Sequence, residues 1–175
     1  MKITSEETIY TARYFKVFKR TIERNGRTYT KDFIERNNVV LILPYTANDE
    51  VYIESQYRDA LERRSLEVVA GQIEEGDEPL ETAKKELKEE AGLTARTWHK
   101  LGVWDLSVNM KGKIHVYAAT DLEEGERALE EDEDIDMLKL SFTEVMKKVE
   151  NGEMTAASHI AALLLFDRMR KEGKL

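Results

Sequence analysis

The stretch from Gly71 to Leu93 reads GQIEEGDEPLETAKKELKEEAGL and combines two turn signals with a helical pattern. Asp77 stands where a helix N-cap is expected, Pro79 suits the first turn of a helix, and Gly92 suits the position after the last turn. Gly71 is the first residue of the stretch, and Gly76 lies just before the helical pattern begins. The pattern therefore predicts a helix over residues 78–91, held between two glycine-containing turns.

The predicted helix carries an apolar stripe with an acidic arc beside it. At about 100° per residue, one face collects Leu80, Ala83, Leu87 and Ala91. The neighbouring arc collects Glu86, Glu89 and Glu90. Like charges four residues apart destabilise an isolated helix. Carboxylates gathered beside a buried face supply the oxygen ligands that Mg²⁺ prefers, whereas a Glu-rich face with Lys partners is usually only solvated surface. Residue types alone leave both interpretations open.

The order of these signals resembles the Nudix box. The matching positions are Gly71, Glu86, Leu87, Glu89, Glu90, Gly92 and Leu93. Two positions depart from the pattern: Asp77 replaces a glutamate, and Lys85 replaces an arginine whose planar fork lysine cannot reproduce. The resemblance implies an α/β (α+β) protein, a Nudix α/β/α sandwich with a mixed sheet, whose box spans residues 71–93.

Outside the box the chain resembles the group of ADP-ribose pyrophosphatases and nucleoside-diphosphate-sugar hydrolases. The similar segments are an N-terminal hairpin, Gln56–Arg58, Leu66–Gly71, Glu130–Ile135 and the C-terminal NGEMTAASHIAALLLF. A departure occurs at Ser107-Val108-Asn109, where the group has a Ser-Pro-Gly-like turn.

This second resemblance implies hydrolysis of the diphosphate bond of ADP-ribose to give AMP and ribose 5-phosphate. The alternatives are another nucleoside-diphosphate sugar such as GDP-mannose, a dinucleoside polyphosphate, a nucleoside triphosphate, or a nucleotide-sugar sensor that binds without turnover. The intact glutamates at 86, 89 and 90 disfavour the sensor, because a pure binder does not need them.

The resemblance also implies a metal site. The Ala70 carbonyl, Glu86 and Glu90 would ligate Mg²⁺, with Mn²⁺ as an alternative ion. Glu89 would ligate a further ion or support the catalytic water. Such cations neutralise the charge with which a diphosphate repels an attacking hydroxide.

Four further residues take roles by the same resemblance. Arg58 would contact the diphosphate, since a guanidinium matches phosphate geometry, and Glu67 would bind substrate or a metal-bound water. A glutamate of the acidic segment 123–136 would act as the base that deprotonates the attacking water, and Glu133 is favoured over Glu131.

Composition excludes several other classes. A net charge of −8 argues against a dedicated nucleic-acid binder, which needs a basic footprint. No apolar run approaches the roughly 20 residues that a membrane helix requires, and the N-terminus lacks the apolar core of a signal peptide. The absence of cysteine excludes thiol catalysis and thiolate metal sites. We therefore expect a cytoplasmic protein that contacts neither nucleic acid nor membrane.

The remaining elements follow from periodicity and turn signals. Residues 14–36 alternate around Asn25-Gly26, which predicts a β-hairpin with a type I′ turn. Strands are expected at 39–43, 51–57, 66–69, 98–106 and 113–120, and helices at 141–150 and 155–171. Ser141 and Glu144 form a predicted capping box.

We expect residues 1–37 to form an N-terminal hairpin subdomain that mediates dimerisation, and residues 38–175 to form the hydrolase domain. A two-stranded hairpin is marginal alone, so it must pack on something. The resembled group forms symmetric dimers with N-terminal strands at the partner's substrate pocket. The resemblance thus implies a homodimer in which residues 14–36 lie near Arg58 or Glu67 of the second copy.

Overall fold

The structure is a computed structural model that describes every residue except position 132. Its strands are β1 (Lys2–Thr11), β2 (Phe15–Arg24), β3 (Arg27–Arg36), β4 (Val39–Pro44), β5 (Glu50–Arg58), β6 (Arg63–Glu67), β7 (Val69–Gln72), β8 (Leu93–Ser107), β9 (Met110–Glu124) and β10 (Ile135–Ser141). Its α-helices are α1 (Pro79–Ala91), α2 (Phe142–Glu150) and α3 (Ala157–Lys171), and a short 3₁₀ helix covers Asp59–Leu61.

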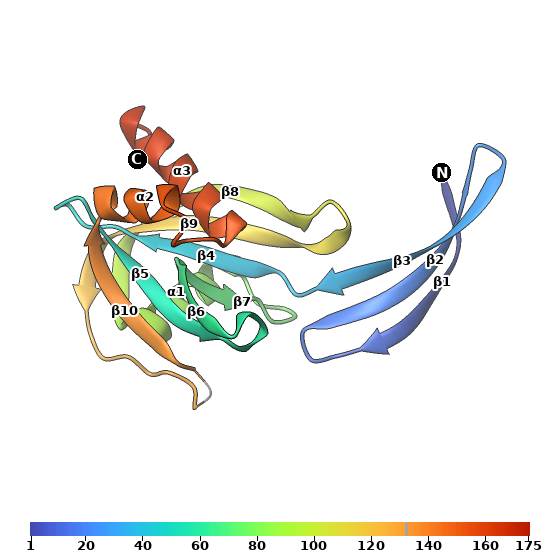
Figure 1. Cartoon of the computed structure of the whole chain (residues 1–175), viewed down its shortest axis with the longest axis horizontal. Helices are drawn as coiled ribbons and strands as arrows, with labels where there is room; N and C mark the ends of the chain where they lie inside the picture. Colours follow the sequence, from blue (N-terminus) through green and yellow to red (C-terminus); the bar gives the residue numbers. More distant parts are fainter. Residues whose placement is uncertain (132) are drawn as a thin grey trace.

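The strands form two sheets, and the larger one extends from the body of the protein into a projecting N-terminal arm (Figure 1). The larger sheet has the order β1-β2-β3-β9-β4-β7, with β8 paired to β9, and the smaller has the order β10-β5-β6. Strand β4 runs parallel to β9 and antiparallel to β7, so the larger sheet is mixed, as predicted.

Strand β4 lies between two hydrophobic layers because successive side chains of a strand point to opposite faces. Leu41 and Leu43 join a cluster with residues of α2 and α3, among them Phe142, Val145, Leu163 and Phe166. Val40 and Ile42 join a second cluster with residues of α1, namely Ala83, Leu87 and Ala91. Helices therefore cover both faces of the sheet, and the predicted sandwich is confirmed.

Helix α1 matches the predicted box helix except at its first turn. Pro79 is the first helical residue, and Gly92 ends the helix in the left-handed conformation (φ 66°). Asp77 was predicted to be the N-cap, and this is wrong: the cap position is Glu78, whose side chain makes no capping hydrogen bond. The Asp77 N–H instead donates to the Glu74 carbonyl (3.1 Å) and closes the preceding turn.

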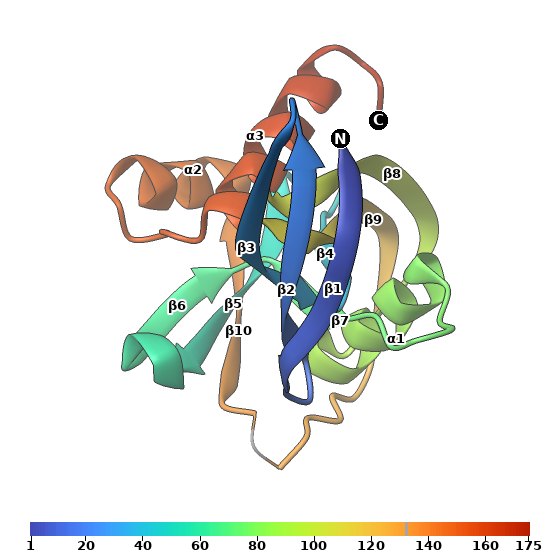
Figure 2. The same cartoon turned by 90° about the vertical axis from the view of Figure 1, so that its right-hand side faces the viewer.

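The predicted hairpin is present, but it belongs to a larger arm. Strands β2 and β3 pair around Asn25 (φ 54°) and Gly26 (φ 69°), the two positive angles that a type I′ turn requires. Residues 2–11 add the strand β1 on the outer side of β2, so the arm (residues 1–37) is a three-stranded sheet (Figure 2). Sequence patterning misses β1 because all ten of its residues are exposed and no buried alternation marks it.

Two more predictions need correction. The segment 66–69 was predicted as one strand, but Val68 separates β6, in the smaller sheet, from β7, in the larger. Strand β10 was not predicted at all, and it pairs with β5 over seven positions. The capping box is confirmed, because Ser141 Oγ accepts from the Glu144 N–H and the Glu144 carboxylate accepts from the Ser141 N–H. None of the helices in the described residues is both long enough and apolar enough to cross a membrane.

Candidate active site

The first part of the site lies where β7 passes the C-terminal half of α1. A β-carbon built on Gly71 would lie 2.2 Å from Cγ and Cδ of Glu86, so only glycine lets this carboxyl group rest against the strand. Ala70, the residue before it, pairs with Leu41 of β4, and β7 is the last strand in the order of the larger sheet. Gly71 of the box thus leaves the space that the Glu86 side chain occupies.

The second part lies between α1 and the smaller sheet. Glu90 points inward from α1 and is 5% exposed, and Glu54 on β5 is 0% exposed. The two carboxyl groups lie close enough for each to affect the pKa of the other. Glu54 is not among the residues predicted from the sequence, where it directly follows the apolar residues Val51, Tyr52 and Ile53 and precedes Ser55 and Gln56.

These carboxyl groups lack the donors that buried carboxylates normally have. Both oxygens of Glu54 and Oε2 of Glu90 are buried without a hydrogen-bond partner among the described residues. Burial, joined by repulsion from neighbouring carboxylates, raises the pKa of both Glu54 and Glu90. Burial also raises the pKa of Glu86 to about 7. Clustered acceptor oxygens without donors suit a hard divalent cation.

Glu89 lies apart from this inward group. Its side chain is 38% exposed, and its carboxylate is 3.7 Å from Nζ of Lys85, the residue that stands where the box has arginine. Its backbone carbonyl accepts from the Ala128 N–H (2.9 Å). In the described part of the chain no three acidic or histidine side chains converge into a ready-made metal site. Convergence of these carboxylates requires a cation or protons between them, because like charges repel.

Arg58 and Glu67 form a bidentate ion pair beside the buried carboxylates. Arg58 Nε donates to Glu67 Oε1 (2.9 Å), and Nη2 donates to Oε2 (2.6 Å). Burial alone would raise the pKa of Glu67, but the hydrogen bonds from Arg58 hold it below its usual value. Arginine has five N–H donors, so three remain for a ligand. The side chain of Arg58 is 39% exposed and that of Glu67 6%.

His159 connects α3 to this ion pair. Its Nδ1 accepts from the Val68 N–H (3.1 Å), which leaves the proton on Nε2, 3.6 Å from Glu67 Oε2. Burial lowers the pKa of His159, so the ring is neutral at pH 7. His159 therefore supports the backbone of Val68 and lies beside the Glu67 carboxylate.

The acidic segment is tied to the end of α1 by Arg127. Arg127 Nε donates to the Glu90 carbonyl (2.5 Å), and Nη2 donates to the Ile135 carbonyl (2.8 Å). Sequence analysis missed Arg127, although it is the single basic residue within residues 123–136. Residue 132 of this segment lies outside the described residues.

The two candidate bases differ in position. Glu133 is half-buried, and its charge contributes to the raised pKa values of Glu86 and Glu90, so it faces the box. Its Oε2 accepts from the Glu130 N–H (2.8 Å). Glu131 is exposed.

Comparison with known proteins places the chain in a family. Residues 35–162 match the NUDIX domain. The chain belongs to the Nudix family. The ADP-ribose pyrophosphatase of Bacillus subtilis (strain 168) is 30% identical over 166 residues, covering 93% of this chain and 90% of that protein. The ADP-ribose pyrophosphatase of Mycobacterium tuberculosis is 32% identical over 165 residues, covering 91% and 80%.

A solved structure titled as that of an ADP compounds hydrolase has the same fold, with a TM-score of 0.84, 22% identity, and coverage of 99% of this chain and 96% of that one. The family and the two relatives make this protein a Nudix pyrophosphohydrolase with an ADP-ribose-pyrophosphatase-like sequence. Proteins of this family generally use a divalent metal ion, and the buried acceptor oxygens of Glu54 and Glu90 fit one.

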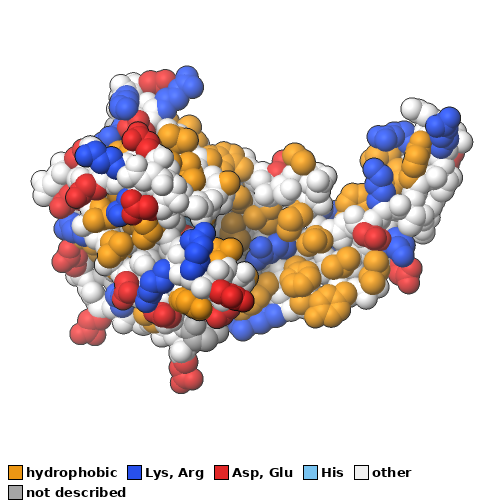
Figure 3. All heavy atoms as spheres, viewed as in Figure 1, with side chains coloured by type: hydrophobic (Ala, Val, Ile, Leu, Met, Phe, Trp, Pro, Cys, Tyr) orange, Lys and Arg blue, Asp and Glu red, His pale blue; other side chains and the backbone are white. Residues whose placement is uncertain are grey.

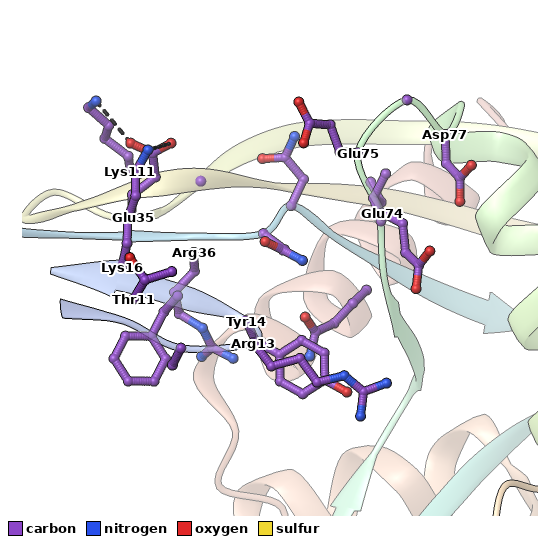
Figure 4. Close-up of a pocket in the computed structure, with 18 residues that line it drawn as sticks. Thr11, Arg13, Tyr14, Lys16, Glu35, Arg36, Glu74, Glu75, Asp77 and Lys111 are labelled. Atoms are coloured by element: carbon purple, nitrogen blue, oxygen red, sulfur yellow. Dashed lines mark hydrogen bonds and ion pairs between the residues drawn. The ribbon is translucent and has the colours of Figure 1, made fainter. Parts of the chain in front are cut away.

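In this Nudix protein a cleft of about 910 Å³ separates the arm from the turn of the box. Arg13 and Tyr14 line it from the arm, and Glu74 and Asp77 line it from the box turn (Figure 4). Glu86 and Glu90 do not line the cleft. The arm therefore faces the box at its N-terminal turn rather than at its glutamates.

Proposed function

We propose that the protein is a Mg²⁺-dependent ADP-ribose pyrophosphatase that forms AMP and ribose 5-phosphate. One observation carries the proposal: both oxygens of Glu54 on β5 and Oε2 of Glu90 on α1 are buried without a donor among the described residues, next to an arginine that keeps free N–H groups. An acidic site beside a guanidinium suits a metal-bridged diphosphate. The names of the two relatives, which cover most of the chain, favour ADP-ribose over other diphosphates.

Glu86, Glu90 and the Ala70 carbonyl would hold Mg²⁺, with Mn²⁺ able to replace it, and Glu89 would hold a further ion. The bound cation supplies charge neutralisation of the diphosphate. Arg58 donates its free N–H groups to phosphate oxygens, and Glu67 keeps the guanidinium plane in position. These two roles explain why Glu67, which orients the guanidinium, is buried, while Arg58, which contacts the phosphate, remains accessible.

Glu133 acts as the general base. Its carboxylate takes one proton from water while the water oxygen attacks a phosphorus of the diphosphate. The P–O bond to the bridging oxygen breaks, and the leaving phosphate takes the bonding electrons and later a proton. Glu133 is chosen over Glu131 because it is the one that faces Glu86 and Glu90.

The active form is a homodimer assembled through the arm, with the hydrolase domain at residues 38–175. Figure 3 shows hydrophobic side chains gathered along the arm. Its exposed members are Ile3, Ile9, Tyr10, Tyr14, Phe15, Tyr29 and Ile34. Taking a fully exposed large apolar side chain to full burial is worth roughly 1.5–3 kcal/mol, and these side chains are 37–56% exposed, so covering each one is worth part of that. A second copy is the occupant that covers this surface by two-fold symmetry.

Other nucleoside-diphosphate sugars are the second candidate substrates. The turn between β8 and β9 carries Val108, which is 98% exposed, where the resembled group has a proline. If this turn contacts the sugar, the preferred sugar will differ from ribose 5-phosphate.

A substrate panel tests the proposal. ADP-ribose, GDP-mannose, a dinucleoside tetraphosphate and ATP are each incubated with Mg²⁺, and release of the nucleotide products is measured. We expect ADP-ribose to be the best substrate. Glu90→Gln should lower kcat by several orders of magnitude, whereas Glu81→Gln, on the exposed side of α1, should not change it.

Three results contradict the proposal. Turnover that persists fully in EDTA excludes metal dependence. Full activity of Glu90→Gln excludes the assigned ligand. Tight binding of ADP-ribose without turnover makes the protein a sensor instead of an enzyme.

A further inference from the structure

Glu54 is the most deeply buried charged residue in the described part of the chain, at 0% exposure. It lies on β5 opposite Glu67 of β6 and Met137 of β10, in the middle of the smaller sheet. Its strand neighbours Tyr52 and Ile53 are core residues. An apolar side chain would be the ordinary choice at such a position.

No donor satisfies this carboxyl group. Both of its oxygens lack a hydrogen-bond partner among the described residues. The hydrogen bonds of the two nearby arginines go to other acceptors: Arg58 donates to Glu67, and Arg127 donates to the backbone carbonyls of Glu90 and Ile135. Leaving a buried acceptor unpaired is costly, and a buried unpaired charge is costlier still. Among the described residues, the fold therefore retains at this position a carboxyl group that needs either a partner from outside the chain or a proton shared with Glu90.

The direction of Glu54 identifies that partner. Its carboxyl group faces Glu90 of the Nudix helix, whose Oε2 is likewise buried and unpaired. Two carboxyl groups from different elements thus present three orphaned oxygens to each other. A bridging water can donate one O–H to each carboxylate but leaves their like charges facing each other, whereas a divalent cation binds several acceptor oxygens and also neutralises their charge.

We propose that Glu54 is an additional ligand of the divalent cation of this Nudix site, contributed by the sheet and opposed to Glu90 of the helix. The proposal rests on the metal dependence argued under the proposed function. The metal site would then include a third secondary-structure element, because the box residues lie on β7 and α1 whereas Glu54 lies on β5. Metal binding would then join the smaller sheet to α1.

The alternative is a carboxylic acid that shares a proton with Glu90 and never meets the metal. The substitution Glu54→Gln separates the two cases. Glutamine has nearly the same size as glutamate, and its N–H group can donate to Glu90 as a protonated Glu54 would. It cannot supply the negative charge that a metal ligand supplies. The measurement is equilibrium binding of Mn²⁺ to the full chain without substrate, in which electron paramagnetic resonance reports the concentration of free Mn²⁺.

Glu54→Gln should weaken Mn²⁺ binding at least 10-fold, the scale seen when groups that support a metal are removed. Glu54→Asp, which keeps the charge but shortens the side chain, should also weaken it. Glu50→Gln, on the same strand outside the site, should bind as the wild type does. The melting temperature in EDTA checks folding: Glu54→Gln should melt at or above the wild-type value, because it removes a buried carboxyl group.

Equal Mn²⁺ affinity in the wild type, Glu54→Gln and Glu54→Asp overturns this inference while leaving metal dependence intact. Absence of Mn²⁺ binding by the wild type overturns the metal dependence of the proposed function and this inference with it. If Glu54→Gln does not fold, Glu54→Asp decides the question: wild-type affinity rejects direct coordination, and a loss supports it.

Discussion

The carboxyl group of Glu86 lies against the backbone of Gly71, where a β-carbon would approach its Cδ to 2.2 Å. The two residues lie on different elements, β7 and α1, so a side chain at position 71 would displace the Glu86 carboxyl group from the strand. A glycine is required here by close approach rather than by backbone conformation, because its φ lies outside the left-handed region.

Gly71→Ala should therefore fold but displace Glu86. A misplacement of about 1 Å can cost about 100-fold in rate, so we expect kcat to fall by about that factor, with weaker binding of the activating cation. Gly125→Ala is the matched control, since a β-carbon there meets only the Gly92 carbonyl at an ordinary 3.6 Å. Steady-state kinetics at several Mg²⁺ concentrations and thermal melting make the comparison. Unchanged kinetics in Gly71→Ala would mean that the position of Glu86 is not critical.

Glu133→Gln should lower kcat by roughly 10²–10⁴-fold with little change in KM, because the base acts in the chemical step and not in substrate binding. Glu131→Gln, an identical change at an exposed position of the same segment, should retain wild-type activity. The reverse result, with Glu131→Gln inactive and Glu133→Gln active, would transfer the role to Glu131.

The box helix, the hairpin, the central strands and the capping box are readable from sequence because each depends on local signals. Glycines, Asn-Gly and 3.6-residue or 2-residue periodicity mark them. Strand β1 and the division of β6 from β7 are not readable, because pairing between distant segments determines them. The same holds for the site: the Nudix pattern names Glu86 and Glu90, but only the register of β5 brings Glu54 to Glu90, and only the fold brings His159 to Val68.

The free energy of unfolding of the metal-free protein should fall as pH rises from about 7 to about 9. Burial raises the pKa of Glu86 to about 7, and it also raises the pKa values of Glu54 and Glu90 above the usual range of a glutamate. A group whose pKa is higher in the folded state contributes stability at low pH and loses it as pH rises through the folded pKa. The lowered pKa values of His115 and His159 reduce stability only below about pH 6.5, where the unfolded chain takes up protons that the folded chain does not.

Urea unfolding in EDTA at several pH values across this range measures the fall, and saturating Mg²⁺ should flatten it, because the cation takes the place of the protons. Glu86→Gln should remove the part of the slope that lies nearest neutral pH. A stability that is constant or rising over this range in EDTA would show that the buried carboxyl groups are not protonated in the folded protein.

The arm leads to a prediction about assembly. Strand β1 is exposed along its whole length, and β3 joins the body only through the pairs Ile34–Met110 and Glu35–Lys111 of β9 among the described strand pairs. Light scattering at micromolar concentration should give twice the chain mass of 20.3 kDa. Ile9→Asp should shift the protein toward the monomer, because it places a charge in the apolar surface that the second copy covers. Lys19→Ala, at an exposed polar position on β2, should leave the dimer unchanged.

Removal of residues 1–36 extends this test from assembly to catalysis. If the arm of one copy completes the substrate site of the other near Arg58 or Glu67, the truncated chain should be monomeric and should lose most of its activity. Its hydrolase domain should still fold, because both hydrophobic clusters consist of residues from Val39 onward. Cooperative melting of the truncated chain verifies this. A folded monomer that hydrolyses ADP-ribose at the full rate would show that each copy has a complete site and that the arm serves assembly alone.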